Sequence, residues 1–204
     1  MLPVDDGYIK YRSERRDGTV APSAELDALN RARTSLFDRK LIGVYPNGVG
    51  FGNLSVRTQG RLFVVTASAT GGMRTLANEH YCLVEEFSTA ENRVRSVGLL
   101  PASSEAMTHG AIYTAHATVQ CVMHVHSRPL FDYWMSGGHL STSASIPYGT
   151  PAMAQAVSAL VVAQPGLPVL FAMAGHDEGM VAYGADVAST LYKLLNELDR
   201  STTP

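Results

Sequence analysis

Residues 119–126 read Val-Gln-Cys-Val-Met-His-Val-His, a mostly apolar run that ends in two histidines. Its length and composition predict a buried β-strand. Because side chains alternate between the two faces of a strand, His124 and His126 share one face and the apolar residues at odd positions share the other. Two imidazoles on one face can bind the same metal ion. The alternative is a pair of partly buried histidines that hydrogen-bond to the backbone.

The sequence around this strand is poor in charge and rich in histidine. From residue 96 to residue 175, the only charged residues are Glu105, Arg128 and Asp132. Five of the seven histidines lie in this stretch, namely His109, His116, His124, His126 and His139. A buried carboxylate is costly without a partner, but near a metal ion it can act as a general acid or base. Glu105 is therefore a candidate for proton transfer, against the alternative of an ordinary carboxylate in the first turn of a helix.

A third candidate ligand follows later in the chain. Residues 174–179 read Ala-Gly-His-Asp-Glu-Gly and come after an apolar run, so His176 is expected in a turn at the end of a strand. Catalytic zinc sites use three protein ligands and leave one position open, and His124, His126 and His176 could supply them. Asp177 and Glu178 could orient a ligand imidazole, but we interpret them as turn residues.

Three short segments rich in glycine, hydroxyl and amide groups are candidate anion-binding loops. Backbone N–H groups and hydroxyls in such segments can bind a phosphate or carboxylate, although each segment alone is more often a turn or a cap. The segments contain Asn53 and Ser55, then Ser68, Thr70 and Gly71, and then Ser103 and Ser104. The basic residues that could reach these loops are Arg57 and Arg74.

The composition is that of a globular protein. The 204 residues are 46% hydrophobic and 17% charged, with a net charge of −2, which argues against a nucleic-acid-binding protein. No apolar run approaches the roughly 18–20 residues that span a bilayer, so we expect no membrane partner. Residues 1–6 lack the basic and apolar regions of a secretory signal. Cys82 and Cys121 are expected to be buried free thiols, which predicts a cytoplasmic protein.

The chain is predicted to form a single domain over residues 1–204, with residues 1–20 as a loose N-terminal arm. Its apolar periodicity and capping residues predict helices and strands in mixed order. Helices are expected over 23–42, 105–116, 128–135 and 152–163 and from 186 onward. Strands are expected over 52–58, 61–67, 81–87, 94–99, 119–125, 168–174 and 180–183. This order predicts an α/β fold, a three-layer α/β/α sandwich.

Taken in order, these segments resemble the class II aldolase/adducin head family (fuculose-phosphate aldolase-like), from about Leu36 to Leu195. The segments that carry the resemblance are Gly52-Asn53-Leu54-Ser55-Val56-Arg57, residues 66–71, Ser103-Ser104-Glu105 with His109 and Ile112-Tyr113, His124-Val125-His126, Ile146-Pro147-Tyr148 and His176. The resemblance implies a central, mostly antiparallel mixed sheet. It also implies a homotetramer whose sites lie between neighbouring subunits, and Phe131, Tyr133, Trp134 and Met135 are expected to form part of that interface.

The resemblance also implies the roles of individual residues. His124, His126 and His176 would bind a divalent metal ion, with Zn²⁺ expected first, and Glu105 would occupy the position of the catalytic carboxylate. A tyrosine would act as the acid, for which Tyr148 is taken first and Tyr133 is the other candidate. The residues expected to hold a phosphorylated sugar are Asn53, Thr70, Gly71, Ser103 and Ser104.

Two departures from the family pattern affect these assignments. The usual threonine-proline-serine/threonine-glycine loop is here Thr-Ala-Ser-Ala-Thr-Gly over residues 66–71, so either Ser68 or Thr70 could be the contact residue. The usual asparagine-histidine-glycine around the third ligand is here Gly175-His176-Asp177. The ligand is retained, whereas the residues next to it differ.

The implied activity is that of a metal-dependent aldolase, a lyase of carbohydrate metabolism. It would perform retro-aldol cleavage of a small sugar phosphate or hydroxy-carbonyl compound through a metal-stabilised enediolate. Alternatives are an epimerase, dehydratase or decarboxylase on the same scaffold, or a non-catalytic adducin-like structural module. Glutamate at position 105 favours the aldolase, because the epimerase branch typically carries aspartate there. Retention of the three histidines and Glu105 argues against the structural module.

Overall fold

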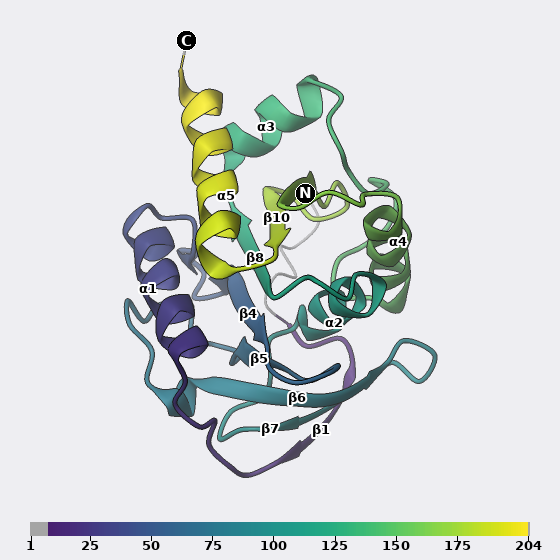
Figure 1. Ribbon diagram of the computed structural model, residues 1–204. Helices are drawn as coiled ribbons and strands as arrows, with labels where there is room; N and C mark the ends of the chain where they lie inside the picture. The colour runs from purple at the N-terminus through teal and green to yellow at the C-terminus, as the bar shows by residue number, and fades with distance from the viewer. Residues whose placement is uncertain (1–7, 204) are drawn as a thin grey trace.

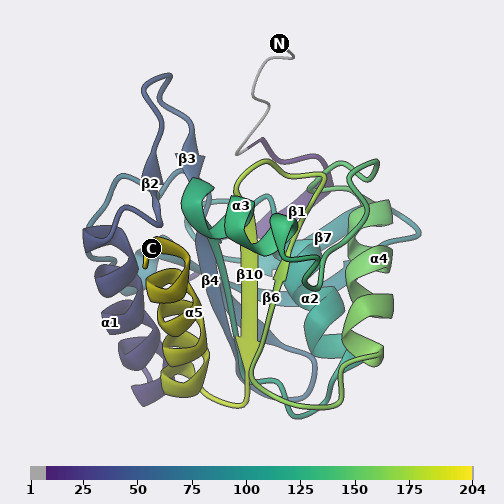
Figure 2. The same ribbon diagram turned by 90° about the horizontal axis from the view of Figure 1, so that it is seen from above.

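The computed structural model describes residues 8–203, in which one large sheet carries helices on both faces (Figure 1). The strands of this sheet lie in the order β1-β7-β6-β5-β4-β8-β10-β9. Their bounds are Arg12–Arg16 (β1), Asn53–Arg57 (β4), Phe63–Thr66 (β5), Tyr81–Ser88 (β6), Arg93–Val97 (β7), Cys121–His126 (β8), Val169–Ala172 (β9) and Gly179–Gly184 (β10). A separate hairpin pairs β2 (Gly43–Val44) with β3 (Gly50–Phe51), and Figure 2 shows it projecting beyond the sheet.

The helices form a layer on each side of the sheet (Figure 2). The helices are α1 (Ala24–Asp38), α2 (Ala106–Ala115), α3 (Arg128–Ser136), α4 (Pro151–Val162) and α5 (Val187–Thr202). One apolar core packs the sheet against α1, α3 and α5, and a second core packs the opposite face against α2 and α4. Only β1 and β7 pair in parallel among the described strands, and the other neighbours in the sheet are antiparallel. The predicted three-layer sandwich with a mostly antiparallel mixed sheet is confirmed.

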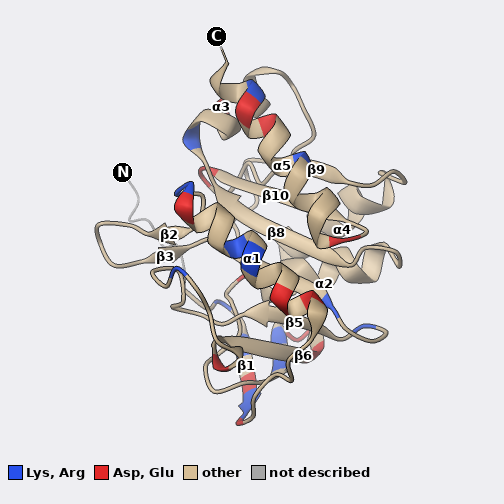
Figure 3. Cartoon of the chain, turned by 60° about the vertical axis from the view of Figure 1, so that its left-hand side comes forward, with Lys and Arg blue, Asp and Glu red and all other residues tan. Residues whose placement is uncertain are grey.

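The strand β8 lies in the interior of the sheet, between β4 and β10. All of its residues are buried, as its apolar sequence predicts. The side chains of Cys121, Met123 and Val125 pack in the core of α1, α3 and α5, whereas Val122 packs in the opposite core. Because side chains alternate, the two histidines of this strand lie on the Val122 face, at the strand's C-terminal end. Figure 3 shows that β8 and its neighbour β10 carry no charged residue.

The predicted helices and strands all form, with ends displaced by a few residues. The side chain of Ser23 caps α1 by accepting a hydrogen bond from the backbone N–H of Leu26. The side chain of Asp186 caps α5 by accepting one from the backbone N–H of Ser189. The helix α1 ends at Asp38, earlier than the predicted residue 42. The reason is that Lys40 adopts a left-handed φ of 60°, which stops the helix, and Leu41 and Ile42 then enter the core just before β2.

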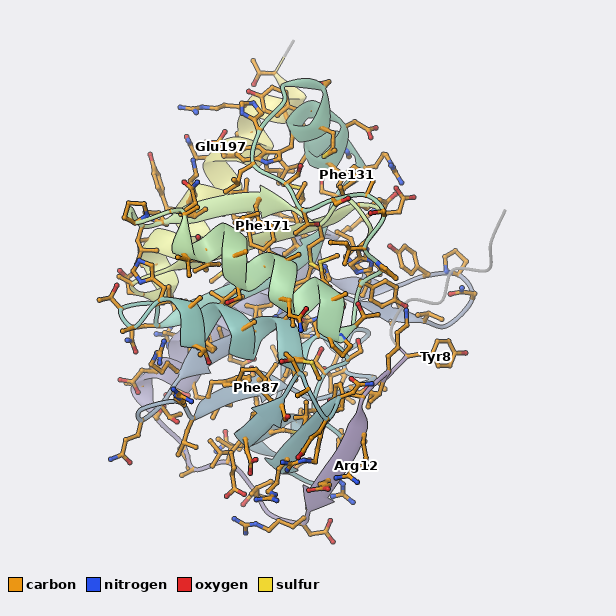
Figure 4. The ribbon with its side chains drawn as sticks, turned by 90° about the vertical axis from the view of Figure 1, so that its right-hand side faces the viewer. Tyr8, Arg12, Phe87, Phe131, Phe171 and Glu197 are labelled. Carbon is orange, nitrogen blue, oxygen red and sulfur yellow. The ribbon has the colours of Figure 1, made fainter. Side chains whose placement is uncertain are left out.

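The expectation of a loose arm over residues 1–20 is wrong for the part that the structure describes. Arg12–Arg16 form β1, which pairs in parallel with β7 at the edge of the sheet. Tyr11 is 5% exposed, and its hydroxyl donates to the carbonyl oxygens of Ala102 and Ser103. Figure 4 shows Arg12 on this edge strand and Tyr8 on the segment that leads into it, where Tyr8 is 62% exposed. The first seven residues of the predicted arm lie outside the described residues.

Two further expectations concern the cysteines and the membrane. Cys82 and Cys121 are buried free thiols, as predicted. Among the described residues, no helix combines the length and apolarity that a membrane crossing requires.

Candidate active site

Three histidines converge at one end of the sheet. His124 and His126 lie on β8, and His176 lies in the turn between β9 and β10, the strand that pairs with β8. One ring nitrogen of each histidine lies within 4.8 Å of the others. The structure thus brings together the histidines that the sequence singles out as candidate ligands.

The turn that carries His176 depends on the glycine before it. A Cβ atom at Gly175 would lie 1.8 Å from the carbonyl oxygen of Ile146, far inside van der Waals contact. Within the turn, the N–H of His176 donates to the carbonyl oxygen of Met173, and the N–H of Gly179 donates to that of His176. Gly175 therefore lets the turn pass the 144–146 segment closely enough to bring His176 over β8.

The histidine cluster fits a divalent metal ion by its spacing. The Nε2 atoms of His126 and His176 are 3.1 Å apart. Two nitrogens on one tetrahedral zinc ion, each at about 2.0–2.1 Å, lie about 3.3–3.4 Å from each other. The pair is therefore close to the separation that a shared ion requires. Neutral imidazole nitrogens are also ligands that zinc and similar divalent ions prefer.

The same histidines are held in the neutral form that metal binding needs. Burial lowers the pKa of His126 to about 3. Burial and the neighbouring His126 lower the pKa of His124 well below its usual value. For His176 the pKa is lowered in the same direction by burial, by the two other histidines and by Lys10. At neutral pH, no proton has to leave these rings before an ion binds.

Asn53 contacts one of the ligand candidates from the neighbouring strand. Asn53 and His124 are register partners on β4 and β8, and the Asn53 side-chain nitrogen lies 3.2 Å from Nδ1 of His124. Oδ1 of Asn53 and Nε2 of His124 are buried without a hydrogen-bond partner among the described residues. Turning the amide by 180° would let Oδ1 accept a hydrogen bond from Nδ1–H, which leaves the Nε2 lone pair available for a metal ion.

Glu105 lies buried at the start of α2. It is 2% exposed, and its Oε2 accepts a hydrogen bond of 2.9 Å from the hydroxyl of Thr108. Its backbone N–H donates to the hydroxyl of Ser103, and this internal hydrogen bond stabilises the 103–105 segment. Tyr11 fixes the same segment through the carbonyl oxygens described above.

A single cavity connects Glu105 with the histidines and the anion-binding loops. It has a volume of about 280 Å³. The hairpin β2–β3 contributes one wall, with Val44, Val49 and Phe51. The lining includes the candidate ligands and substrate-binding residues that the sequence indicates, namely His124, His126, His176, Glu105, Asn53, Ser68, Thr70, Gly71, Ser103 and Ser104. The structure therefore gathers these segments, which are distant in sequence, around one space.

Tyr148 does not line this cavity but packs directly behind it. Its ring stacks on His176 with 4.1 Å between ring centroids and an interplanar angle of 22°. Lys10 also lies over the Tyr148 ring, with Nζ 3.7 Å from the centroid. Tyr133, the other candidate for the acid, lies on α3 against His139 and is 38% exposed. Of the two tyrosines, only Tyr148 contacts a candidate metal ligand.

Arg57 and Arg74, the basic residues that could reach the candidate anion-binding loops, do not line the cavity. Arg57 donates to the backbone carbonyl oxygens of Gly60, Tyr113, His116 and Val119. Arg74 forms a bidentate ion pair with Asp38. Each guanidinium is instead bound to acceptors outside the cavity.

Arg33 on α1, which no motif in the sequence indicated, binds the backbone of the loop that contains Thr70. Arg33 is 1% exposed and donates to the backbone carbonyl oxygens of Thr70, Met73 and Arg74. It lies on the buried face of α1, together with Leu26, Leu29 and Leu36. A charged residue on such a face was the available signal, since a buried guanidinium requires acceptors.

The second residue that the sequence did not indicate is Tyr45, in the hairpin between β2 and β3. Its hydroxyl lies 2.7 Å from Nδ1 of His126. Its ring packs on Phe51, which in turn packs on His126. No local pattern links Tyr45 to a histidine 81 residues later in the chain.

His109 on α2 lies in a buried network beside the site. Its Nδ1 is 2.6 Å from the hydroxyl of Ser55, and that hydroxyl is 2.8 Å from the hydroxyl of Tyr113. Burial, with a smaller effect of His124, lowers the pKa of His109 to about 3.

Comparison with known proteins identifies a family over most of the chain. The model of the Class II Aldolase and Adducin N-terminal domain matches residues 47–201. This range contains the three histidines, Glu105 and the candidate anion-binding loops. No curated protein matches the sequence.

Several solved structures have a similar fold at low sequence identity. An L-fuculose 1-phosphate aldolase has 16% identity and a TM-score of 0.65, covering 89% of this chain and 84% of its own. A sugar-phosphate aldolase from Thermotoga maritima has 15% identity and a TM-score of 0.62, covering 84% of this chain and 89% of its own. YgbL from Klebsiella pneumoniae, described as an aldolase/epimerase/decarboxylase, has 18% identity and a TM-score of 0.61, covering 87% of this chain and 86% of its own.

Proposed function

The chain belongs to the Class II Aldolase and Adducin N-terminal domain family, and from that premise we propose that it is a metal-dependent lyase. The proposed reaction is retro-aldol cleavage of a carbon–carbon bond in a small sugar phosphate or hydroxy-carbonyl compound. The observation that carries this proposal is the convergence of three buried neutral histidines with a buried glutamate around one cavity. Such a site combines an ion-binding group with a separate residue for proton transfer.

His124, His126 and His176 would hold a divalent ion, which we propose to be Zn²⁺. When bound, the ion supplies Lewis-acid stabilisation of the negative charge that develops on substrate oxygens during carbon–carbon cleavage. Three neutral ligands leave the full charge of the ion uncompensated. The site therefore favours a substrate fragment that becomes negatively charged.

Glu105 is proposed to carry the proton to and from carbon. It lines the cavity with the histidines and is enclosed by protein, so its carboxylate is shielded from bulk water. The hydrogen bond from Thr108 orients Oε2. A fixed carboxylate next to the reacting carbon is what general base catalysis requires.

Tyr148 is proposed as the acid at the other end of the reaction. Its stacking on His176 keeps its ring at the site, and Lys10 over the same ring adds a positive charge nearby. Tyr133 is a weaker candidate, because it lies on α3, packs against His139 and does not line the cavity.

The loops of Asn53, Thr70, Gly71, Ser103 and Ser104 are proposed to hold the anionic end of the substrate. The hydroxyl of Thr70 already donates to the carbonyl oxygen of Ala67. A hydroxyl has one proton, so Thr70 can only accept from a ligand through that group. Ser68, which also lines the cavity, is therefore the better candidate for a hydroxyl donor at this loop.

We further propose a cytoplasmic homotetramer whose sites lie at subunit interfaces. Tyr133 and Met135 on α3 are 38% and 37% exposed, which supports part of the predicted apolar interface. Trp134 is instead buried in the core that packs α1, α3 and α5 against the sheet. The two unpaired thiols are consistent with a reducing compartment.

The experiment that tests this function measures proton exchange and cleavage with the metal controlled. Purified protein is analysed for bound metal, reloaded with Zn²⁺, and incubated in D₂O with dihydroxyacetone phosphate, glycolaldehyde or pyruvate. Exchange of the donor's α-proton, followed by NMR, reports proton transfer without knowledge of the aldehyde. Adding aldehydes then tests carbon–carbon bond formation. Exchange and condensation that both disappear with a chelator would support the proposal.

The same experiment separates the alternatives. Metal-dependent exchange without carbon–carbon chemistry would favour an epimerase or another proton-transfer enzyme, as the description of YgbL allows for that protein. A protein that takes up no divalent metal after reloading would favour a non-catalytic module like the adducin head.

A further inference from the structure

The hydroxyl of Tyr45 lies between a candidate metal ligand and a carboxylate. It is 2.7 Å from Nδ1 of His126 and donates to Oε2 of Glu178 over 3.5 Å. The contact with His126 is the shorter and stronger of the two. Tyr45 comes from the β2–β3 hairpin, whereas Glu178 comes from the turn between β9 and β10.

Glu178 is itself held from the other side. Its Oε1 accepts a hydrogen bond of 3.1 Å from Nε of Arg128, the first residue of α3. Arg128 also pairs with Asp177 and Asp132. A continuous chain of contacts therefore runs from His126 through Tyr45 and Glu178 to Arg128.

The direction of this chain follows from the number of protons on each group. A tyrosine hydroxyl has one proton and an ionised carboxylate has none. When Tyr45 donates its proton to Glu178, it can only accept from Nδ1 of His126. Nδ1 must then carry a hydrogen, and in a neutral imidazole this leaves the lone pair on Nε2. Nε2 is the atom that faces Nε2 of His176 at 3.1 Å.

The backbone of Glu178 gives an independent reason to assign its side chain a role. Its φ is +65°, in the left-handed region that glutamate rarely adopts and that glycine adopts freely. Strained residues of this kind concentrate at functional sites. A glutamate kept at such a position is explained by a side chain that the site uses.

We propose that Tyr45 and Glu178 are positioning residues that fix His126 in the form whose Nε2 is available to a metal ion. The proposal rests on the metal site described above and changes the interpretation of Glu178 from a turn residue to a support of that site. Hydrogen-bond partners on the second nitrogen of a ligand histidine fix its tautomer and ring orientation. Here that partner is a tyrosine that connects the imidazole to a carboxylate.

The first test measures the zinc affinity of the full chain by competition with a chelator of known affinity. Tyr45→Phe removes the hydroxyl and keeps the ring that packs on Phe51. We expect its zinc affinity to fall about 10–100-fold, as for other partners of ligand histidines. The matched control is Tyr192→Phe, at a tyrosine that is 71% exposed, for which no change is expected. Affinity of Tyr45→Phe within twofold of the wild type would overturn the proposal.

The second test asks whether Glu178 acts through Tyr45. Glu178→Gln should also weaken zinc binding, because its amide can donate to Tyr45 and reverse the chain. The double variant should be little weaker than Tyr45→Phe alone, since both changes break one chain. Losses that multiply in the double variant would overturn the proposed connection.

Glu178→Gly is a control that distinguishes loss of the carboxylate from a loss of folding. It removes the carboxylate and relieves the left-handed backbone, so the metal-free protein should be at least as stable as the variant with glutamine. Its zinc affinity should nevertheless fall as it does for Glu178→Gln. Unchanged affinity in Glu178→Gly would count against the proposal.

A third measurement separates this inference from the proposed function. NMR of the metal-free protein with ¹⁵N-labelled histidine reports which nitrogen of His126 carries the proton. Protonation at Nδ1 in the wild type, lost or mixed in Tyr45→Phe, is the expected result. Protonation at Nε2 in the wild type would overturn the inference, whatever the metal content. Failure of the wild type to bind zinc would instead contradict the proposed function.

Discussion

The Nε2 atoms of His126 and His176 lie 3.1 Å apart although 50 residues separate them in the chain. The pairing of β8 with β10 brings Gly179 opposite His126, and the turn before Gly179 places the His176 ring over the strand. With His124 two residues earlier on the same face, the cluster has the three imidazoles that a catalytic metal site uses. The predictions below test what this cluster and its surroundings do.

Replacing His124 should abolish stoichiometric metal binding. His124→Ala removes one of three ligands and leaves a buried pair that cannot hold the ion with the same geometry. We expect less than one tenth of the wild-type zinc content after reloading and dialysis, measured by mass spectrometry of the metal. His116→Ala, at a histidine outside the cavity, is the control and should bind zinc normally. Full zinc content in His124→Ala would mean that the ion binds elsewhere.

Replacing Glu105 should separate metal binding from proton transfer. Glu105→Gln keeps the size of the side chain and its contact with Thr108 but removes the base. We expect zinc content to be unchanged and the α-proton exchange rate to fall about 10²–10⁴-fold, the usual contribution of a general base. Glu91→Gln, at an exposed glutamate, is the matched control. Full exchange activity in Glu105→Gln would show that another group moves the proton.

The metal-free protein should lose stability as the pH falls below about 6.5. His109 has a pKa of about 3 in the folded protein, and an unfolded histidine has a pKa of about 6.5. Between these values the unfolded chain binds a proton that the folded chain excludes, so the free energy of unfolding decreases as pH falls. Each such group contributes up to about 1.4 kcal/mol per pH unit.

Urea unfolding between about pH 5 and pH 6.5, with a chelator present, measures this slope. His109→Asn retains a polar group near the hydroxyl of Ser55 and removes the titrating ring. Its slope should be smaller by the equivalent of about one proton. The same slope in the variant and the wild type would show that His109 does not resist protonation in the folded state.

A methyl group at Gly175 should disturb both stability and the metal site. The added Cβ would lie 1.8 Å from the carbonyl oxygen of Ile146, so the turn that carries His176 has to move. Gly175→Ala should lower the free energy of unfolding by about 1–3 kcal/mol or more and weaken zinc binding. Gly166→Ala is the control, because a Cβ there meets nothing within 4 Å. Equal unfolding free energies for the two variants would mean that the turn adapts without cost.

Local patterns in the sequence account for the elements and for two of the three candidate metal ligands. The alternation of residues 121–126 depends only on the geometry of a strand, and it correctly placed the histidines of β8 on the face opposite Cys121, Met123 and Val125. Ser23 and Asp186 cap their helices as expected, because a cap contacts a backbone N–H three residues away. The two cores follow from these elements, since each amphipathic face has to be covered.

Other parts of the site depend on contacts that no local pattern encodes. Lys10 reaches Tyr148 across 138 residues, and Tyr45 reaches His126 across 81. Arg57 and Arg74, which could reach the candidate loops by their place in the sequence, bind backbone and carboxylate acceptors instead. The strand β1 was missed because its charged sequence, Arg-Ser-Glu-Arg-Arg, has no apolar alternation. Its edge position and its ion pairs with β6 and β7 permit such a sequence.

The sequence by itself determined the central strand, the histidine pair, the layered fold and the family to which the chain belongs. Those features follow from residues within a few positions of one another, or from the order of segments along the chain. Only the tertiary structure decided which residues surround the histidines. The register of β4, β8 and β10 sets Asn53 against His124, and two separate hairpins bring Tyr45 and Glu178 to His126. These contacts depend on strand register and turn geometry, which arise when the whole sheet forms.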